Sequence, residues 1–142
     1  MVTSRYGKEV SMHLIIDGYS HNPDILKSEE FIYRWLDQYP AEIGMTKISS
    51  PYVVKYVGAK PEDWGLSGLV LIAESHISIH TFVEPGFVNI DVFSCKSFDA
   101  EQVIKDISNR FELTGIKTHL LGRAMEDVGC PAEAGGIVSM KQ

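Results

Sequence analysis

Several features that would place the chain in a specialised class of protein are scarce or missing. It has only two cysteines, Cys95 and Cys130, in 142 residues, which are too few for a disulfide framework. No apolar run approaches the ~20 residues that a membrane helix needs, and the N-terminal stretch lacks the apolar core of a signal peptide. There is no linker, internal repeat or low-complexity tract. We therefore expect one domain, residues 1–142, in the reducing cytoplasm and without a membrane partner.

Positive charge is also scarce, with 13 Lys and Arg against 19 Asp and Glu and a net charge of −6. This balance argues against broad binding to the phosphate backbone of nucleic acids and is compatible with a small cationic ligand. Metal-ligand spacings such as His-x-x-x-His and glycine-rich phosphate loops are missing. We expect no metal and no nucleic acid, and we interpret His76 as a turn residue and His119 as a strand residue.

Hydrophobic residues make up 44% of the chain, enough for one core without crosslinks. Their spacing predicts strands over 12–17, 52–57, 68–73, 76–82, 87–93 and 116–121. It also predicts one helix that begins at Asn22 and is stopped by Pro40, and a second helix that begins at the capping pattern Asp99-x-x-Gln102 and is stopped by Gly115. The continuous run 68–73 is typical of a strand that is covered on both faces or paired centrally.

The order of these elements predicts an α+β fold, a two-layer sandwich with a mainly antiparallel sheet and helices on one face. Tight hairpins are expected at Glu74-Ser75 and at Glu84-Pro85-Gly86. From Gly122 onward the chain is small and polar, and we expect a loosely ordered tail in which Cys130 has no chemical role.

Polar residues gather near the first of these hairpins. Alternation places Ser78 and His80 on one face of their strand, Ser67 precedes the neighbouring strand, and Cys95 follows the next one. Hydroxyl, imidazole and thiol groups that converge could carry out nucleophilic and proton-transfer chemistry. Spacing alone also allows the plainer interpretation that Glu74-Ser75 is a surface turn.

The run from Leu66 to Cys95 resembles the core of the prokaryotic S-adenosylmethionine decarboxylase proenzymes. The resemblance includes Glu-Ser-His at 74–76, then His80, Glu84 and Cys95. The segment 13–19, His-Leu-Ile-Ile-Asp-Gly-Tyr, is similar to the family's opening strand. Length and element order agree over nearly the whole chain.

The resemblance implies that the chain cuts itself between Glu74 and Ser75. Ser75 would attack the carbonyl of Glu74 to give an ester, His80 would remove the α-proton of the esterified serine, and Ser67 would assist. Elimination and hydrolysis would leave a pyruvoyl group at residue 75, so that the products are a β chain 1–74 and an α chain 75–142.

The implied pyruvoyl group forms a Schiff base with the substrate's α-amine and accepts the electrons freed as carbon dioxide leaves, in place of pyridoxal phosphate. Cys95 matches the family's proton donor, although a lone cysteine is more often a buried structural residue. Glu84 matches the acid that holds the ribose hydroxyls and is otherwise a solvated hairpin carboxylate. Phe82 matches an aromatic that stacks on adenine and is otherwise a packing residue.

Two departures from the family pattern concern the substrate. Tyr19 is followed by Ser20 where members often have glycine and cysteine, and Pro61 lies near the place of a second adenine-stacking aromatic, for which Trp64 could substitute. Four acidic side chains suit a sulfonium or a guanidinium equally well: Asp17, Glu62, Asp63 and Glu84.

The function expected is therefore conversion of S-adenosylmethionine to its decarboxylated form, the aminopropyl donor for spermidine and polyamine synthesis. Two alternatives remain open: the same chemistry on arginine or ornithine, and a non-catalytic regulatory homologue. The resemblance further implies a homodimer with sites at the subunit interface, which a bare sheet face makes plausible.

Overall fold

The computed structural model describes residues 11–123; the tail from 124 onward, with Cys130, lies outside the described residues. The elements follow in the order β1 (Ser11–Ser20), α1 (Pro23–Leu26), α2 (Glu29–Glu42), β2 (Tyr52–Val57), β3 (Trp64–Ile72), β4 (Ser75–Phe82), β5 (Phe87–Ser94), α3 (Ala100–Phe111) and β6 (Leu113–Arg123). Every predicted strand is present. Within this range no helix is both long and apolar enough to cross a membrane.

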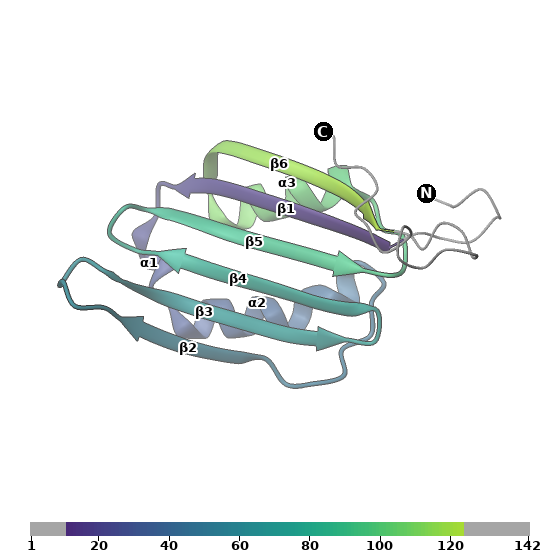
Figure 1. The fold of residues 1–142 in the computed structure, drawn as a ribbon, viewed down its shortest axis with the longest axis horizontal. Coiled ribbons are helices and arrows are strands. Elements are labelled where there is room, and N and C mark those ends of the chain that lie inside the picture. The colour runs from purple at the N-terminus through teal and green to yellow at the C-terminus, as the bar shows by residue number, and fades with distance from the viewer. Residues whose placement is uncertain (1–10, 124–142) are drawn as a thin grey trace, which may run out of the picture.

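The strands form one antiparallel sheet in the order β2-β3-β4-β5-β1-β6. The three helices lie together behind it and leave the other face open (Figure 1). Helix α2 packs across β2 and β3, and α3 packs across β1 and β6. The predicted two-layer α+β sandwich is confirmed.

Every second side chain along each strand points toward the helices and fills the space between sheet and helices. On β4 these are Ile77, Ile79 and Thr81, all buried as the alternation predicted. Helix α2 approaches β3 so closely that a Cβ at Gly68 would lie 2.8 Å from a methyl of Leu36. A side chain at this position would therefore force Leu36 to move.

The alternate side chains point away from the helices and form the open face of the sheet. Leu69 and Leu71 of β3 are 39% and 44% exposed there. The run 68–73 is thus paired centrally, between β2 and β4, and within one chain it is covered only on the face toward the helices. Its continuous apolarity leaves an apolar strip on the open face, and apolar strips of this kind commonly mark an interface.

The first predicted helix is in fact two helices. Helix α1 ends at Leu26, and α2 begins anew because the Ser28 hydroxyl accepts a hydrogen bond from the Phe31 N–H (3.0 Å). Pro40 does not stop α2 but lies in its last turn, where little of the hydrogen-bond ladder remains to be lost. The backbone N–H of Met45 then bonds the Pro40 carbonyl and closes the helix end.

Gly115 does not stop the second predicted helix either. Helix α3 is capped at its start by Asp99, as predicted, but ends at Phe111 because Glu112 takes the left-handed conformation (φ 55°). Gly115 lies inside β6, opposite an irregularity of β1 between Asp17 and Tyr19. The last strand is accordingly longer than predicted and continues through Gly122 and Arg123.

Candidate active site

The hairpin between β3 and β4 is strained at its serine. The strands are joined by only Ala73 and Glu74, and Ser75 pairs with Ile72 on one side and with Ser94 on the other. Ser75 has a φ of 156°, a value that residues other than glycine rarely adopt and that costs roughly 1–3 kcal/mol. The turn therefore holds stored conformational energy at the one residue with a nucleophilic side chain.

A backbone donor points at the carbonyl that precedes this serine. The Cys95 N–H donates to the carbonyl oxygen of Glu74 over 2.9 Å. Such a donor stabilises negative charge on that oxygen when a nucleophile adds to the carbonyl carbon. The same contact places residue 95 beside the turn, and the thiol of Cys95 is free and exposed. The structure thus brings Glu74, Ser75 and Cys95 together at one end of the sheet.

A second pair of predicted residues meets on the open face. Ser67 of β3 and His80 of β4 are cross-strand partners, and the Ser67 Oγ lies 2.8 Å from the His80 Nδ1. This hydrogen bond orients the imidazole and leaves its other ring nitrogen available, a usual arrangement for a histidine that moves protons.

The strained turn at Ser75 and the Ser67–His80 pair are far apart within one chain. His80 lies five residues along β4 from Ser75, a separation of about 16 Å at the usual rise of an extended strand. One copy of the chain therefore does not place the imidazole next to the strained turn.

Three predicted substrate-binding residues lie at the His80 end of the sheet. The Phe82 ring stacks on Phe87 with centroids 4.5 Å apart and remains partly exposed on the open face. The Trp64 indole N–H donates to the Glu84 carboxylate over 3.3 Å. Trp64 also packs against the core, and the Lys55 ammonium lies 4.7 Å from its ring centroid. Trp64 thus orients Glu84 but does not join Phe82 on the open face.

Asp17 lies on the open face in the same cross-strand row as His80. It accepts a hydrogen bond from the Asn89 amide over 2.6 Å, and both residues line a hollow of about 240 Å³ together with Tyr19, Phe87 and Lys117. The hollow adjoins Phe82, so the acidic group and the aromatic rings are neighbours.

A polar network near the strained turn was missed by the sequence interpretation. His13 Nε2 lies 3.1 Å from an oxygen of Asp91, and the Ser78 hydroxyl donates to the other oxygen over 3.4 Å. The hydrogen bond with His13 lowers the pKa of Asp91, and burial opposes this effect. The alternation of β5 and β4 could have indicated this network, because it places Asp91 and Ser78 on one face.

His76 is not a turn residue, contrary to the prediction. It is the second residue of β4 and its ring lies edge-on to Phe93, with centroids 5.6 Å apart. Burial lowers the pKa of His76 below its usual 6.5, and the nearby His13 lowers it further. The folded state therefore favours the neutral ring.

The stability of the fold should depend on pH through His76. Because its pKa is lower in the folded chain, the unfolded chain takes up a proton first as the pH falls below 6.5, and the free energy of unfolding decreases. In the uncut Ser75→Ala background, His76→Gln should flatten this decrease between about pH 7.5 and about pH 5.5. Urea titrations at several pH values measure it, and equal slopes with and without His76 would contradict the assignment.

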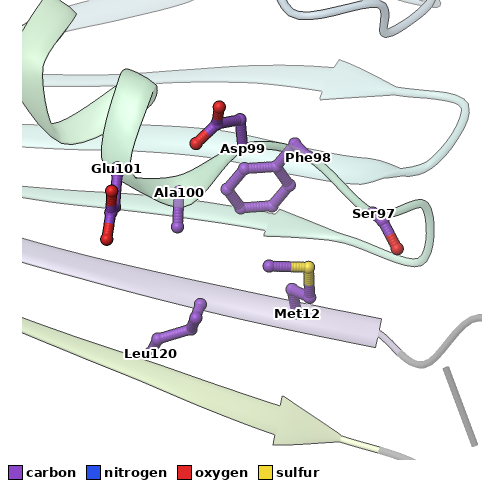
Figure 2. Close-up of a pocket in the computed structure, with 7 residues that line it drawn as sticks. All are labelled: Met12, Ser97, Phe98, Asp99, Ala100, Glu101 and Leu120. Atoms are coloured by element: carbon purple, nitrogen blue, oxygen red, sulfur yellow. The ribbon is translucent and has the colours of Figure 1, made fainter. Parts of the chain in front are cut away.

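A further hollow lies away from these residues. It has a volume of about 560 Å³ and is bordered by Met12, Phe98, Asp99 and Leu120, on the helix side between the start of α3 and strands β1 and β6 (Figure 2). It contains none of the predicted site residues, so the chemistry is not expected there. Among residues 11–123 no three His, Cys, Asp or Glu side chains are grouped as metal ligands.

Fold and site together define a two-layer α+β protein with a strained serine turn at one end of an open sheet and a Ser–His pair toward the other. A sequence model of the family described as S-adenosylmethionine decarboxylase matches residues 12–124. The chain belongs to this family.

Individual relatives agree with this result. The chain is 30% identical over 115 residues to an S-adenosylmethionine decarboxylase proenzyme of Archaeoglobus fulgidus, covering 80% of this chain and 97% of the relative. It is 34% identical over 114 residues to the proenzyme of Clostridium botulinum strain Langeland, covering 78% and 93%. The crystal structure of the adenosylmethionine decarboxylase from Aquifex aeolicus VF5 superposes with a TM-score of 0.61 at 30% identity, covering 80% of this chain and 90% of that one.

Proposed function

We propose that this protein is a pyruvoyl-dependent decarboxylase that cuts its own chain and converts S-adenosylmethionine to decarboxylated S-adenosylmethionine and carbon dioxide, a step of polyamine synthesis. Membership of the family supports the substrate. The observation that carries the self-processing is the strained Ser75 beside a Glu74 carbonyl that already accepts a hydrogen bond from Cys95. Processing would divide residues 1–142 into a β chain 1–74 and an α chain 75–142.

Cutting begins at the strained turn. The Ser75 hydroxyl oxygen adds to the Glu74 carbonyl carbon, and the Cys95 N–H stabilises the resulting oxyanion. The bond from that carbon to the Ser75 nitrogen then breaks, the nitrogen takes the proton, and the peptide becomes an ester. Release of the strained φ at Ser75 favours this direction.

Elimination completes the cut. His80 of a second copy of the chain, oriented by Ser67, removes the α-proton of residue 75. The bond between the Cβ of residue 75 and the ester oxygen breaks, so that Glu74 leaves as a carboxylate. Water then hydrolyses the dehydroalanine and releases ammonia, which leaves a ketone at residue 75. The residues around the turn fit this group, since an exposed thiol and a backbone donor adjoin it.

The pyruvoyl ketone supplies an electron sink for loss of carbon dioxide from an α-amino acid. The chain's own residues bind and protonate the substrate. Cys95 donates a proton to the substrate carbon after decarboxylation, Phe82 offers an exposed aromatic face, and the carboxylates of Glu84 and Asp17 favour a cationic substrate with hydroxyl groups.

A homodimer would complete the site. In a dimer whose open faces stack about 10 Å apart, a two-fold axis across the strands reverses their direction. The Ser75 end of one chain then lies over the His80 end of the other, which removes the separation within one chain. The apolar strip formed by Leu69 and Leu71, with the exposed Tyr52, Val54 and Tyr56 of β2, provides the surface to be buried.

Cys95→Ser should separate cutting from catalysis. The backbone N–H that faces Glu74 is retained in this variant, so the chain should still be cut at a rate near that of the wild type. A serine hydroxyl is a far weaker acid than a thiol, and we expect turnover to fall by about 100-fold or more. Intact-mass analysis and product formation measure the two effects, and full turnover would exclude Cys95 as the proton donor.

The substrate is tested by release of carbon dioxide. The purified, processed protein is incubated separately with carboxyl-labelled S-adenosylmethionine, arginine and ornithine. We expect labelled carbon dioxide only from S-adenosylmethionine. Release from arginine or ornithine instead would retain the chemistry and change the substrate, and release from none by a fully cut protein would refute the proposal.

A further inference from the structure

One segment that is remote in sequence encloses the strained turn. Residues 44–49, which lie between α2 and β2, run alongside the end of β3 on the side away from β4. The Ala73 N–H donates to the Thr46 carbonyl over 2.7 Å, and the Ile48 N–H donates to the Leu71 carbonyl over 3.0 Å. The 44–49 segment thus continues the sheet locally and holds the strand that leads into the turn.

The same segment is attached to the other side of the turn. The Lys96 ammonium donates to the Gly44 carbonyl over 3.0 Å, and the buried Ser94 hydroxyl lies 3.5 Å from the Met45 sulfur. Residues 94–96 surround Cys95, whose N–H points at the Glu74 carbonyl. The 44–49 segment therefore contacts both the chain around Cys95, which supplies the N–H donor, and the end of β3 that leads to Glu74, which supplies the carbonyl.

Glu74 contributes its side chain to this arrangement. The Thr46 N–H donates to the Glu74 carboxylate over 3.1 Å, while the Glu74 backbone carbonyl accepts from Cys95. One residue is thus held through its side chain on one side and through its backbone on the other. Because the carboxylate is bound by a backbone amide, its position does not depend on a flexible side-chain partner.

We propose that Glu74 is a positioning residue for self-cleavage: through its carboxylate, held by the Thr46 N–H, it keeps its own carbonyl carbon in line for attack by Ser75 and its carbonyl oxygen on the Cys95 N–H. This inference rests on the proposed self-processing. In this proposal the Glu74 side chain positions the backbone, whereas the Glu74 carbonyl is the group that is attacked. The 44–49 segment then takes part in processing because it holds the side chain.

The test is the rate of cutting in two variants of Glu74. Glu74→Ala removes the acceptor for the Thr46 N–H and should slow cutting by about tenfold or more, the usual effect of losing one charge-assisted hydrogen bond. Glu74→Gln retains an oxygen acceptor and should cut within about threefold of the wild type. The rate is measured from the appearance of the two fragments by intact mass after synthesis in a cell-free system.

Further measurements separate positioning from general damage to the fold. Glu29→Ala, at an exposed glutamate on α2, is the matched control and should cut at the wild-type rate. Lys96→Met removes the donor to Gly44 without altering Glu74 and should also slow cutting. In the uncut Ser75→Ala background, Glu74→Ala should leave the thermal midpoint nearly unchanged, whereas a merely structural role would lower it.

The outcomes distinguish this inference from the function on which it rests. A wild-type chain that is never cut at 74/75 would overturn the proposed function. A wild type that is cut normally, together with Glu74→Ala cut at the same rate, would overturn only the positioning role. Slow cutting in both Glu74→Ala and Glu74→Gln with a lowered thermal midpoint would likewise overturn it, because the defect would then be one of folding.

Discussion

Ser75→Ala should yield a single uncut chain of 15.8 kDa with no measurable decarboxylase activity. The alanine has no oxygen to add to the Glu74 carbonyl, so neither the ester nor the later ketone can form. The wild type should give two fragments, the smaller of which, 75–142, begins at residue 75 with a keto-acid cap. Intact-mass analysis of freshly purified material detects both results.

A matched control lies on the same strand. Ser78 is a half-buried serine of β4 whose hydroxyl donates to Asp91, and Ser78→Ala should be cut like the wild type. Cutting of the Ser75→Ala chain at the normal position and rate would show that another group is the nucleophile. An uncut wild-type chain with full activity would contradict the pyruvoyl account altogether.

Mixed dimers should reveal a site built from two chains. We expect Ser75→Ala and His80→Ala chains to be nearly inactive alone. When they are co-expressed with different tags and the mixed dimer is purified, one of its two sites contains both an intact Ser75 and the partner's intact His80. Such a dimer should regain about half of the wild-type activity and should cut its His80→Ala chain.

The reciprocal mixture is the control. A dimer of one wild-type chain and one chain that carries both substitutions has the same number of changes, but each of its two sites then lacks one group. It should be uncut and inactive. If each chain formed its own site, this dimer would be half active and the first mixture would be inactive, so the two results together decide between the arrangements.

Much of the fold was accessible from local patterns. Alternation along β4 and β5 correctly separated Ile77 and Ile79 from His80 and Asn89, because a strand turns its side chains to opposite faces with a period of two. The capping pattern at Asp99 located the start of α3, since its side chain satisfies a backbone donor within the first turn. Helix ends were less accessible: α3 ends at Glu112, which adopts the left-handed conformation, and the predicted stop, Gly115, also has a positive φ but lies within β6.

The candidate site was accessible only in part. Two neighbouring strands with a short hairpin allowed Ser67 and His80 to converge, and the structure gives them a 2.8 Å contact. The hydrogen bond from Cys95 to Glu74 did not follow from any pattern, because it joins backbone atoms of segments whose register depends on the whole sheet. The network of His13, Asp91 and Ser78 was missed because its members come from three different strands.

By itself the sequence determined which residues face the core, where the tight hairpins lie, and which chemically active side chains are present. These properties depend on near neighbours and on the period of each element. Only the tertiary structure decided that Ser75 is strained, that the 44–49 segment lies alongside its turn, and that the Cys95 N–H faces the Glu74 carbonyl. Those properties depend on strand order and register, which arise when the complete sheet packs against its helices.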